Sequence, residues 1–247
     1  MPATPAWPPR SLPRLFVRAF LHDGANVELD ASQANYLGNV MRLGIGAELL
    51  LFDGQSGEWL ARIAEAGKKR MTLRAERQMR GPETIPDVWL AFAPVKRAQT
   101  DWLVEKATEL GVARLIPVMT RRTVAERVRL DRLEAIAIEA AEQCGRTRLP
   151  DICEPTPLKA LLSGRNGRTL YFADESGGEP AALAFKPGPA LILVGPEGGF
   201  TEEERTLIRA ASNAVPISLG PRILRAETAA LAALASFMAI AGDWRSY

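Results

Sequence analysis

The sequence predicts an α/β protein with a mostly parallel sheet, preceded by a small all-β domain. Beyond residue 87, short apolar strands alternate with helices, which is typical of a parallel sheet covered on both faces. Before residue 77, short strands bounded by Gly and Asp follow one another. In addition, two of the later strands run into Gly- and Pro-rich loops and then helix starts, the place where open α/β sheets bind ligands.

The first domain is expected to be a small β-barrel over residues 13–76. Its strands are predicted at 15–20, 48–53, 58–63 and 70–74, and one helix at 31–41 with Ser32 or Asp30 as its cap. Residues 53–57, Asp-Gly-Gln-Ser-Gly, are typical of a hairpin connection. The Pro-rich residues 1–12 predict an extended tail, and residues 77–87, which lack an apolar period, predict a linker.

The second domain is expected over residues 88–247. Its strands are predicted at 88–93, 113–118, 169–173, 190–194 and 216–219, and its helices at 99–110, at 130–144 and from near Thr201 and Ala226. The apolar stretch 226–242 starts with charged and polar residues and is shorter than the roughly 20 residues that a membrane span needs. We therefore expect a core helix, no membrane segment and, without a secretory signal, a cytoplasmic protein.

Composition excludes several classes of site. Cys144 and Cys153 are too few for a disulfide framework or a metal site, and His22 is the sole histidine, which argues against zinc and a Ser-His-Asp triad. Residues 1–150 hold 22 Lys and Arg against 18 Asp and Glu, and 25 of the 31 cations in the chain are Arg. Arginine suits contact with RNA phosphates and bases, although a GC-rich genome enriches it equally well.

The first Gly-rich loop, Gly195-Pro-Glu-Gly-Gly199, precedes a capping box formed by Thr201 and Glu204. It could be a simple strand-to-helix reversal or a phosphate loop, because helix N-termini attract anions. Neither phosphate-loop motif is present, and Glu197 with the acidic residues 202–204 would repel a pyrophosphate. The loop therefore favours a ligand that is neutral or cationic at this point.

The second loop lies within Leu219–Ala229 and places Arg222, Arg225 and Glu227 before an Ala-rich helix. Small residues let a helix pack closely against a neighbour, in a helix–helix interface or in the core. Arg225 and Glu227 could simply form a local surface ion pair, which contributes little.

Together the two loops, Leu-x-Gly-Pro-Glu-Gly-Gly-Phe and Leu-Gly-x-Arg-Ile-Leu-Arg-x-Glu-Thr-Ala, resemble the SPOUT superfamily of methyltransferases. More narrowly, they resemble the ribosomal RNA small subunit methyltransferase E family. Further similar segments are 13–17, 40–43, 106–112 and 139–146, so the resemblance covers about residues 13–243. Asn35-Tyr36 and Cys144 depart from the family's usual residues, outside the two loops.

The resemblance implies a PUA-like, RNA-binding barrel and a SPOUT domain with a C-terminal trefoil knot. It implies a homodimer that uses S-adenosylmethionine, without a metal, to methylate uridine N3 in 16S ribosomal RNA of the small subunit, at position 1498 in the usual numbering. The implied cofactor-binding residues are Leu193, Gly195, Glu197, Gly198, Leu219, Ile223, Leu224 and Thr228.

Arginines are candidates for the remaining roles. A guanidinium near uridine would favour loss of the N3 proton, so Arg225, Arg14 and Arg146 are candidate catalytic residues, with Glu227 to orient Arg225 or accept the proton. The candidate RNA contacts are Arg14, Arg42, Arg121, Arg122 and Arg146, with Arg97 a weaker one. Two alternatives stay open: a SPOUT methyltransferase acting on another rRNA or tRNA nucleotide, and a non-catalytic RNA-binding protein.

Overall fold

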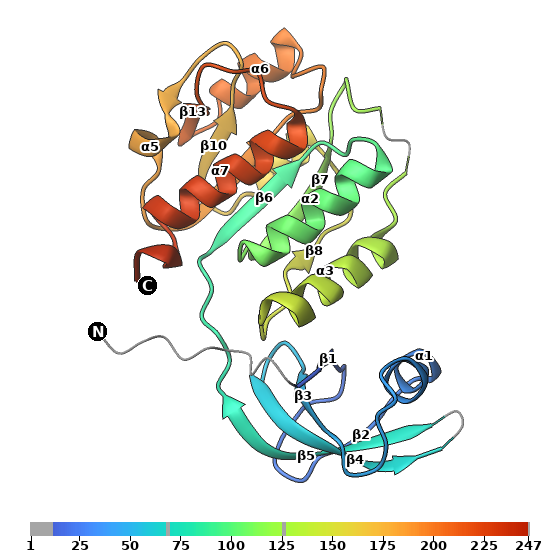
Figure 1. The fold of residues 1–247 in the computed structure, drawn as a ribbon. Coiled ribbons are helices and arrows are strands. Elements are labelled where there is room, and N and C mark those ends of the chain that lie inside the picture. Colours follow the sequence, from blue (N-terminus) through green and yellow to red (C-terminus); the bar gives the residue numbers. More distant parts are fainter. Residues whose placement is uncertain (1–11, 68–69, 125–126, 247) are drawn as a thin grey trace. The chain divides into compact units, whose positions relative to one another are not determined.

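The computed structural model describes residues 12–67, 70–124 and 127–246, and the chain divides into two compact units (Figure 1). The first unit comprises Met1–Thr84 and Ala141–Leu149, and the second comprises Ile85–Ala140 and Pro150–Tyr247. Residues 141–149 thus group with the first unit, although the sequence predicted one continuous domain from residue 88. Nearly all of the expected Pro-rich tail lies outside the described residues.

Within the described residues, the first unit is built on a five-stranded sheet with the order β1-β3-β4-β5-β2. Its strands are β1 (Arg14–Phe16), β2 (Asn26–Glu28), β3 (Glu48–Phe52), β4 (Glu58–Ala66) and β5 (Met71–Arg80). β1 pairs with β3 in parallel, and the other neighbouring strands are antiparallel. Because β1 and β2 lie at opposite edges, the expected barrel is seen as a curled sheet rather than a closed ring of hydrogen bonds (Figure 1).

Local residue chemistry explains the turns of this unit. The expected hairpin at 53–57 joins β3 to β4, and the Asp53 carboxylate accepts hydrogen bonds from the backbone N–H groups of Gln55 (2.8 Å) and Ser56 (2.7 Å). Asp30 caps the helix α1 (Ala31–Asn35) by accepting a bond from the Gln33 N–H. The expected helix over 31–41 continues as a π-helix, η1 (Tyr36–Val40).

The second unit contains, in its described part, an eight-stranded sheet with the order β11-β13-β10-β12-β6-β7-β8, and β9 pairs with β7. All neighbouring strands of its described part pair in parallel, as the alternation of strands and helices predicted. The strands are β6 (Val88–Phe92), β7 (Arg114–Met119), β8 (Asp151–Ile152), β9 (Thr156–Pro157), β10 (Thr169–Ala173), β11 (Glu179–Pro180), β12 (Ala190–Val194) and β13 (Ala214–Ser218). The helices are α2 (Arg97–Glu109), α3 (Leu130–Cys144), α4 (Leu158–Gly164), α5 (Ala181–Ala184), α6 (Glu202–Arg209), α7 (Ala226–Ile240) and the 3₁₀ helix η2 (Asp243–Ser246).

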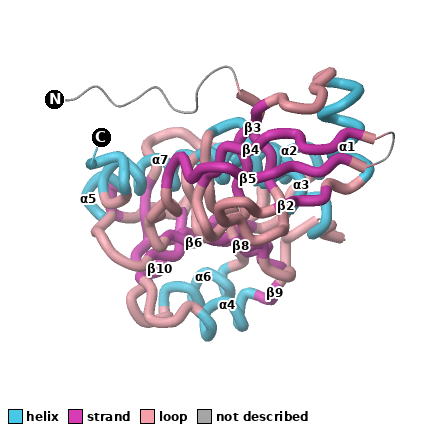
Figure 2. The backbone as a smooth tube through the Cα atoms, turned by 90° about the horizontal axis from the view of Figure 1, so that it is seen from below, coloured by secondary structure: helices cyan, strands magenta, loops and turns pink. Residues whose placement is uncertain are grey.

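Helices cover both faces of this sheet, and successive strand residues point to opposite faces. Leu90 of β6 and Ile192 of β12 pack in one core with α2, α3 and α7. Their neighbours Ala91 and Leu193 pack in another core with α4 and α6. Figure 2 shows the same layers, with α4 and α6 on one side of the sheet and α2, α3 and α7 on the other.

The helix α7 is the most apolar element of the chain. Among the described residues, Ala226–Arg245 is the one segment that by length and composition could cross a membrane, which is weak evidence. In the structure Ala230, Leu234 and Phe237 are buried in the same core as Leu90. The segment therefore serves as a core helix, as its polar ends predicted.

Candidate functional site

Two loops of the second unit leave the carboxyl ends of strands that flank β10. β12 leads through residues 195–201 to α6, and β13 leads through residues 219–225 to α7. Because β10 lies between β12 and β13 in a parallel sheet, both loops emerge at the same edge, on either side of the end of β10. The strand–loop–helix layout predicted for both segments is confirmed.

The first loop is held in place by the expected capping box. The Thr201 hydroxyl accepts a hydrogen bond from the Glu204 N–H (3.3 Å), and the Glu204 carboxylate accepts one from the Thr201 N–H (3.0 Å). The other oxygen of Glu204 accepts a bond from the backbone N–H of Arg121 (2.8 Å), which follows β7. Glu204 therefore fixes the start of α6 and the neighbouring loop together.

Glycines let the first loop fold tightly against its surroundings. Gly199 has a φ of +68°, and a Cβ at this position would lie 2.9 Å from Oε1 of Glu175. A Cβ at Gly195 would lie 3.1 Å from the Phe200 ring. Substituents at either position would push on residues that line the space between the loops.

A cavity of about 240 Å³ opens between the two loops and the end of β10. It is lined by Ala173, Asp174, Glu175, Gly177, Val194, Gly195, Pro196, Glu197, Gly199, Phe200, Arg205, Ile217, Ser218, Leu219, Gly220, Pro221, Arg222, Ile223, Leu224, Ala226 and Ala229. Its walls combine apolar side chains with backbone polar groups and a few charges, as ligand sites commonly do. We call it the loop cavity.

Carboxylates outnumber arginines on the wall of the loop cavity by three to two. Arg205 pairs with Asp174 (3.4 Å) and Glu175 (3.1 Å). Burial raises the pKa of the Asp174 carboxyl, but hydrogen bonds from Arg209 and Ser176 outweigh burial and hold that pKa below its usual value. Glu197 has no ion pair or hydrogen bond within the described part of the chain. A neutral or cationic ligand therefore suits this cavity better than an anionic one.

Five of the expected cofactor-binding residues line the loop cavity, namely Gly195, Glu197, Leu219, Ile223 and Leu224. Ile223 is 97% exposed, an unusual state for a large apolar side chain.

The other three expected residues lie beside the loop cavity rather than on its wall. The side chain of Leu193 is fully buried in the core with α4 and α6, so only its backbone could face a ligand. Thr228 is exposed on α7. The carbonyl of Gly198 accepts a hydrogen bond from Nη1 of Arg122 (2.5 Å).

Sequence reasoning missed a third segment of the site. Asp174 and Glu175 follow β10 and line the loop cavity, where they bind Arg205. The available signal was the run Asp-Glu-Ser-Gly-Gly directly after the strand predicted at 169–173. It repeats the strand-then-glycine layout of the other two loops.

Arg225 and Glu227 do not form the local ion pair considered from the sequence. Arg225 is exposed at the N-cap of α7, without a side-chain capping bond, whereas Glu227 is 7% exposed in its first turn. Neither side chain makes an ion pair or hydrogen bond among the residues that the structure describes. The guanidinium of Arg225 is thus available to a ligand, and orientation by Glu227 receives no support from the geometry.

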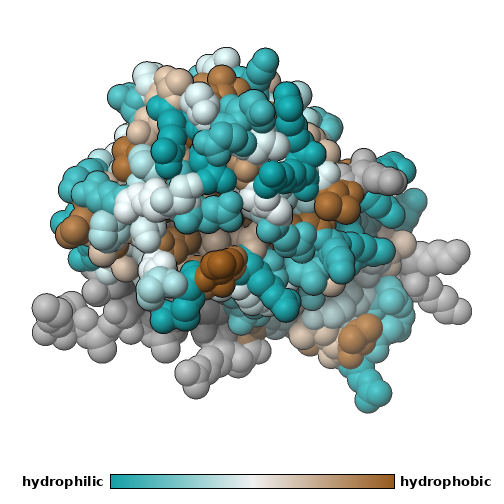
Figure 3. Space-filling view, turned by 90° about the horizontal axis from the view of Figure 1, so that it is seen from above, coloured by the Kyte–Doolittle hydropathy of each residue, from teal (hydrophilic) through white to brown (hydrophobic). Residues whose placement is uncertain are grey.

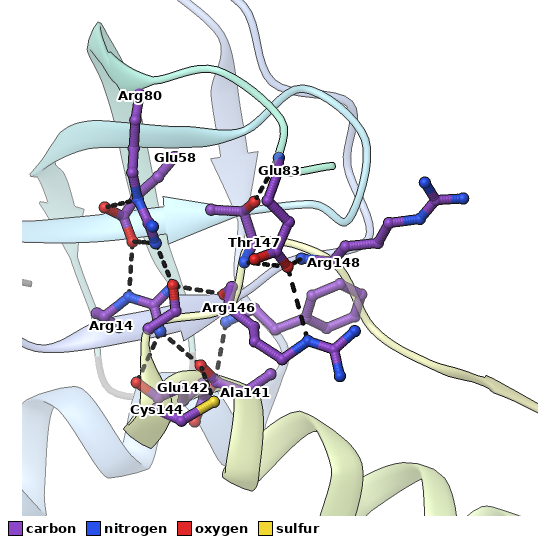
Figure 4. Close-up of polar contacts among 12 residues, drawn as sticks. Arg14, Glu58, Arg80, Glu83, Ala141, Glu142, Cys144, Arg146, Thr147 and Arg148 are labelled. Atoms are coloured by element: carbon purple, nitrogen blue, oxygen red, sulfur yellow. Dashed lines mark hydrogen bonds and ion pairs between the residues drawn. The ribbon is translucent and has the colours of Figure 1, made fainter. Parts of the chain in front are cut away.

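Arg14 is buried in the first unit and bound on several sides (Figure 4). Its side chain is 2% exposed; Nε donates to Glu58 (2.6 Å). Nη1 donates to the carbonyls of Ala141 (2.5 Å) and Glu142 (2.8 Å), and Nη2 to that of Arg146 (2.6 Å). A guanidinium engaged in this way is not available to RNA or to a reacting base, so the structure argues against both expected roles of Arg14.

Arg146 is also buried in the first unit. Only 6% of its side chain is exposed, and its Nε lies 3.6 Å from Glu83. Glu83 also accepts hydrogen bonds from the backbone of Thr147 and Arg148 (Figure 4). This burial argues against the expected contact of Arg146 with RNA, and against a catalytic role.

The remaining expected RNA-contact arginines are exposed. Arg42 lies in the first unit and adopts a φ of +58°. Arg121 and Arg122 lie in the second unit beside the first loop, where Glu204 and Gly198 hold them. The face seen in Figure 3 is largely hydrophilic, with small separate hydrophobic areas. Arg97 is exposed too and lies 4.0 Å from Asp101.

Comparisons with known proteins point to one family. The family described as "RNA methyltransferase domain" matches residues 82–238, and "RNA methyltransferase PUA domain" matches residues 29–76. A relative from Rickettsia conorii named "Ribosomal RNA small subunit methyltransferase E" is 34% identical over 227 residues, which cover 90% of this chain and 93% of the relative.

Two solved structures extend this likeness to the fold. The Ribosomal RNA small subunit methyltransferase E of Neisseria gonorrhoeae, bound to S-adenosyl methionine, has a TM-score of 0.86 at 29% identity, covering 94% of this chain and 99% of that one. A putative methyltransferase of Legionella pneumophila, in complex with the same cofactor, has a TM-score of 0.84 at 29% identity with the same coverage.

Proposed function

Because the chain belongs to the ribosomal RNA small subunit methyltransferase E family, we propose that it uses S-adenosylmethionine to methylate N3 of a uridine in 16S ribosomal RNA, at position 1498. The loop cavity is the observation that carries the proposal, because both family-like loops build it. We further propose that the enzyme works in the cytoplasm as a homodimer and that its C-terminal region is knotted. The family resemblance supports these three points.

The residues of the loop cavity fit S-adenosylmethionine chemically. Leu219 and Leu224 offer apolar contacts for a flat adenine ring, and the glycine backbone of 195–199 offers polar groups to it. The acidic balance of the cavity suits a sulfonium cation, with Glu197 free to face it. When bound, the cofactor supplies an electrophilic methyl group.

Arg225 is the residue that we propose to act on the uridine. N3 carries a proton and becomes a good nucleophile only after that proton leaves. A guanidinium near the ring stabilises the negative charge that develops and thereby lowers the N3 pKa. Arg225 is exposed and adjoins Leu224 of the loop cavity, and its guanidinium has no ion pair or hydrogen bond among the described residues.

Glu227 is the candidate proton acceptor. It is 7% exposed and lies two residues after Arg225, in the first turn of α7. A carboxylate without a hydrogen-bond partner in the described structure is free to accept a proton. Its role is separate from orienting Arg225, because the two side chains form no hydrogen bond or ion pair with each other in the described part of the chain.

Labelled methyl transfer into small ribosomal subunits, followed by mapping of the modified base, tests the function. Calorimetry with S-adenosylmethionine tests the site separately. Modification of another rRNA or tRNA nucleotide would replace the proposed substrate, and absence of cofactor binding would leave a non-catalytic RNA-binding protein. The first outcome contradicts the proposed substrate, and the second contradicts the proposed cofactor site.

The variant Arg225→Ala tests the chemical role. We expect a fall in kcat of about 10²-fold with unchanged cofactor affinity, a loss typical for one charge-stabilising donor. Arg245→Ala is the matched control, because Arg245 is exposed in η2, beyond the far end of α7. Activity near wild type in Arg225→Ala would remove this residue from the mechanism.

A further inference from the structure

A second cavity, of about 420 Å³, lies in the second unit near the start of α2. It is formed by the loop that follows β6, the first turns of α2 and α3, and residues 124 and 127–129 before α3. Its apolar residues include Pro94, Val95, Val128 and Leu133. We call it the basic cavity because of the charges described next.

Cations outnumber anions around the basic cavity. The cations are Lys96, Arg97, Arg127, Arg129 and Arg132, and the anions are Asp101 and Glu197. The loop cavity has the opposite balance, with three carboxylates and two arginines on its wall. Two neighbouring cavities of opposite charge are suited to two different ligands.

Some of these cations are held by carboxylates and others are not. Arg132 binds Asp101 with hydrogen bonds of 2.6–3.0 Å, which ties the start of α3 to α2. Arg129 pairs with Asp131 at 2.5 Å. The side chains of Lys96 and Arg127 are exposed and make no ion pair or hydrogen bond among the residues that the structure describes. The basic cavity therefore has two positive charges available to a ligand, beside arginines that carboxylates hold in place.

The basic cavity and the loop cavity share one wall residue, Glu197. Methyl transfer requires the acceptor to lie directly beside the donor. A ligand in the basic cavity would meet that requirement if the loop cavity holds the cofactor. An apolar surface beside free cations suits a nucleotide, because the base can pack on the apolar residues and the phosphate can bind the cations.

We propose that the basic cavity receives the target nucleotide of the RNA, with Lys96 and Arg127 binding its flanking phosphates and Glu197 separating it from the cofactor. The inference rests on the proposed methyltransferase function. It assigns substrate binding to Lys96 and Arg127, neither of which was a candidate from the sequence.

Lys96→Ala, Arg127→Ala and the double variant test the proposal. The measurements are KM for unmodified small subunits, the affinity for a 16S RNA fragment between 0.05 and 0.3 M salt, and cofactor affinity by calorimetry. A contact with a single-stranded phosphate contributes a salt slope of about −0.7, which corresponds to about fivefold in affinity at 0.1 M salt. We expect about that loss for each single variant, about 25-fold for the double variant, and cofactor affinity equal to that of wild type.

Lys159→Ala is the matched control, because Lys159 is exposed on α4 and lines neither cavity. Variants that behave like this control would overturn the proposal. So would an equal loss of cofactor affinity, which would make the basic cavity part of the cofactor site, or a changed oligomeric state with unchanged RNA affinity. A wild-type protein that transfers no methyl group would refute the proposed function instead, and its RNA affinity would still show whether these cations bind RNA.

Discussion

Arg14→Ala distinguishes a structural arginine from an RNA-binding one. The substitution removes the Nε bond to Glu58 and the bonds to three backbone carbonyls at residues 141–146. Glu58 would then remain fully buried with Arg80 as its ionic partner, at 3.3 Å. Because Arg80 is 33% exposed, it compensates only in part for the lost charge.

The expected loss of stability is about 3 kcal/mol in the first unit. Removal of one partner from a buried ion pair typically costs about 3–5 kcal/mol, and the remaining contact with Arg80 favours the lower value. Arg14→Lys should restore little of the lost stability, since one ammonium group cannot replace a guanidinium that binds both Glu58 and backbone carbonyls on other sides. The double substitution Arg14→Met/Glu58→Leu should recover most of the loss, because it leaves no unpaired buried charge.

Hydrogen exchange of peptides that cover β3 and β4 measures this loss in the first unit itself. A local loss of about 3 kcal/mol corresponds to about 150-fold faster exchange. Arg77→Ala, an exposed arginine of β5, is the control. Exchange within threefold of wild type in Arg14→Ala, together with weaker RNA binding, would refute the structural role and restore the RNA-binding one.

Three further predictions concern the second unit. Thr201→Ala should remove the capping box and lower the free energy of unfolding by about 1 kcal/mol. The Tm in a calorimetric scan should then fall by about 2–4 °C, and an unchanged Tm would contradict this prediction. Gly195→Ala should weaken S-adenosylmethionine binding about tenfold in a calorimetric titration, because the added Cβ would lie 3.1 Å from the Phe200 ring. Binding equal to that of wild type would show that the ring moves away without cost and would contradict the prediction. The lowered pKa of Asp174 means that its bonds stabilise the fold above the unfolded-state pKa of about 3.8 and that this contribution is lost as pH falls through the folded-state pKa. The difference in unfolding free energy between wild type and Asp174→Asn should therefore be largest near neutral pH and shrink below pH 3.8, and a difference that grows in acid would be inconsistent with the shift.

Regular elements with clear ends were predictable from the sequence. The helix α3 has the predicted bounds, 130–144, because an apolar period ends at Gly145, whose φ is +87°. The strands β2, β8, β9 and β11 were missed because two or three residues carry no periodicity. β5 continues to Arg80, into the expected linker, because pairing with β4 stabilises residues without an apolar pattern of their own.

The sequence allowed the residues of the candidate site to be predicted where they are glycines and carboxylates of a single loop. Gly195 and Glu197 lie on the loop cavity as expected, since the loop directly follows a strand end. Burial of arginines was not predictable in the same way. The partner of Arg14 lies 44 residues away, at Glu58, and only the three-dimensional fold brings the two together. Sequence alone therefore could not separate Arg14 from exposed arginines such as Arg122.

Glu197 borders both the loop cavity and the basic cavity, and this position couples two binding equilibria. A charge that enters one cavity changes the electrostatic free energy of the ligand in the other through the shared carboxylate. Thermodynamic linkage requires the effect to be equal in both directions, so a cofactor that alters RNA affinity must have its own affinity altered by RNA to the same extent. Loss of the sulfonium charge after transfer would change that coupling, and one carboxylate would thereby give the protein a means of distinguishing its substrate complex from its product complex.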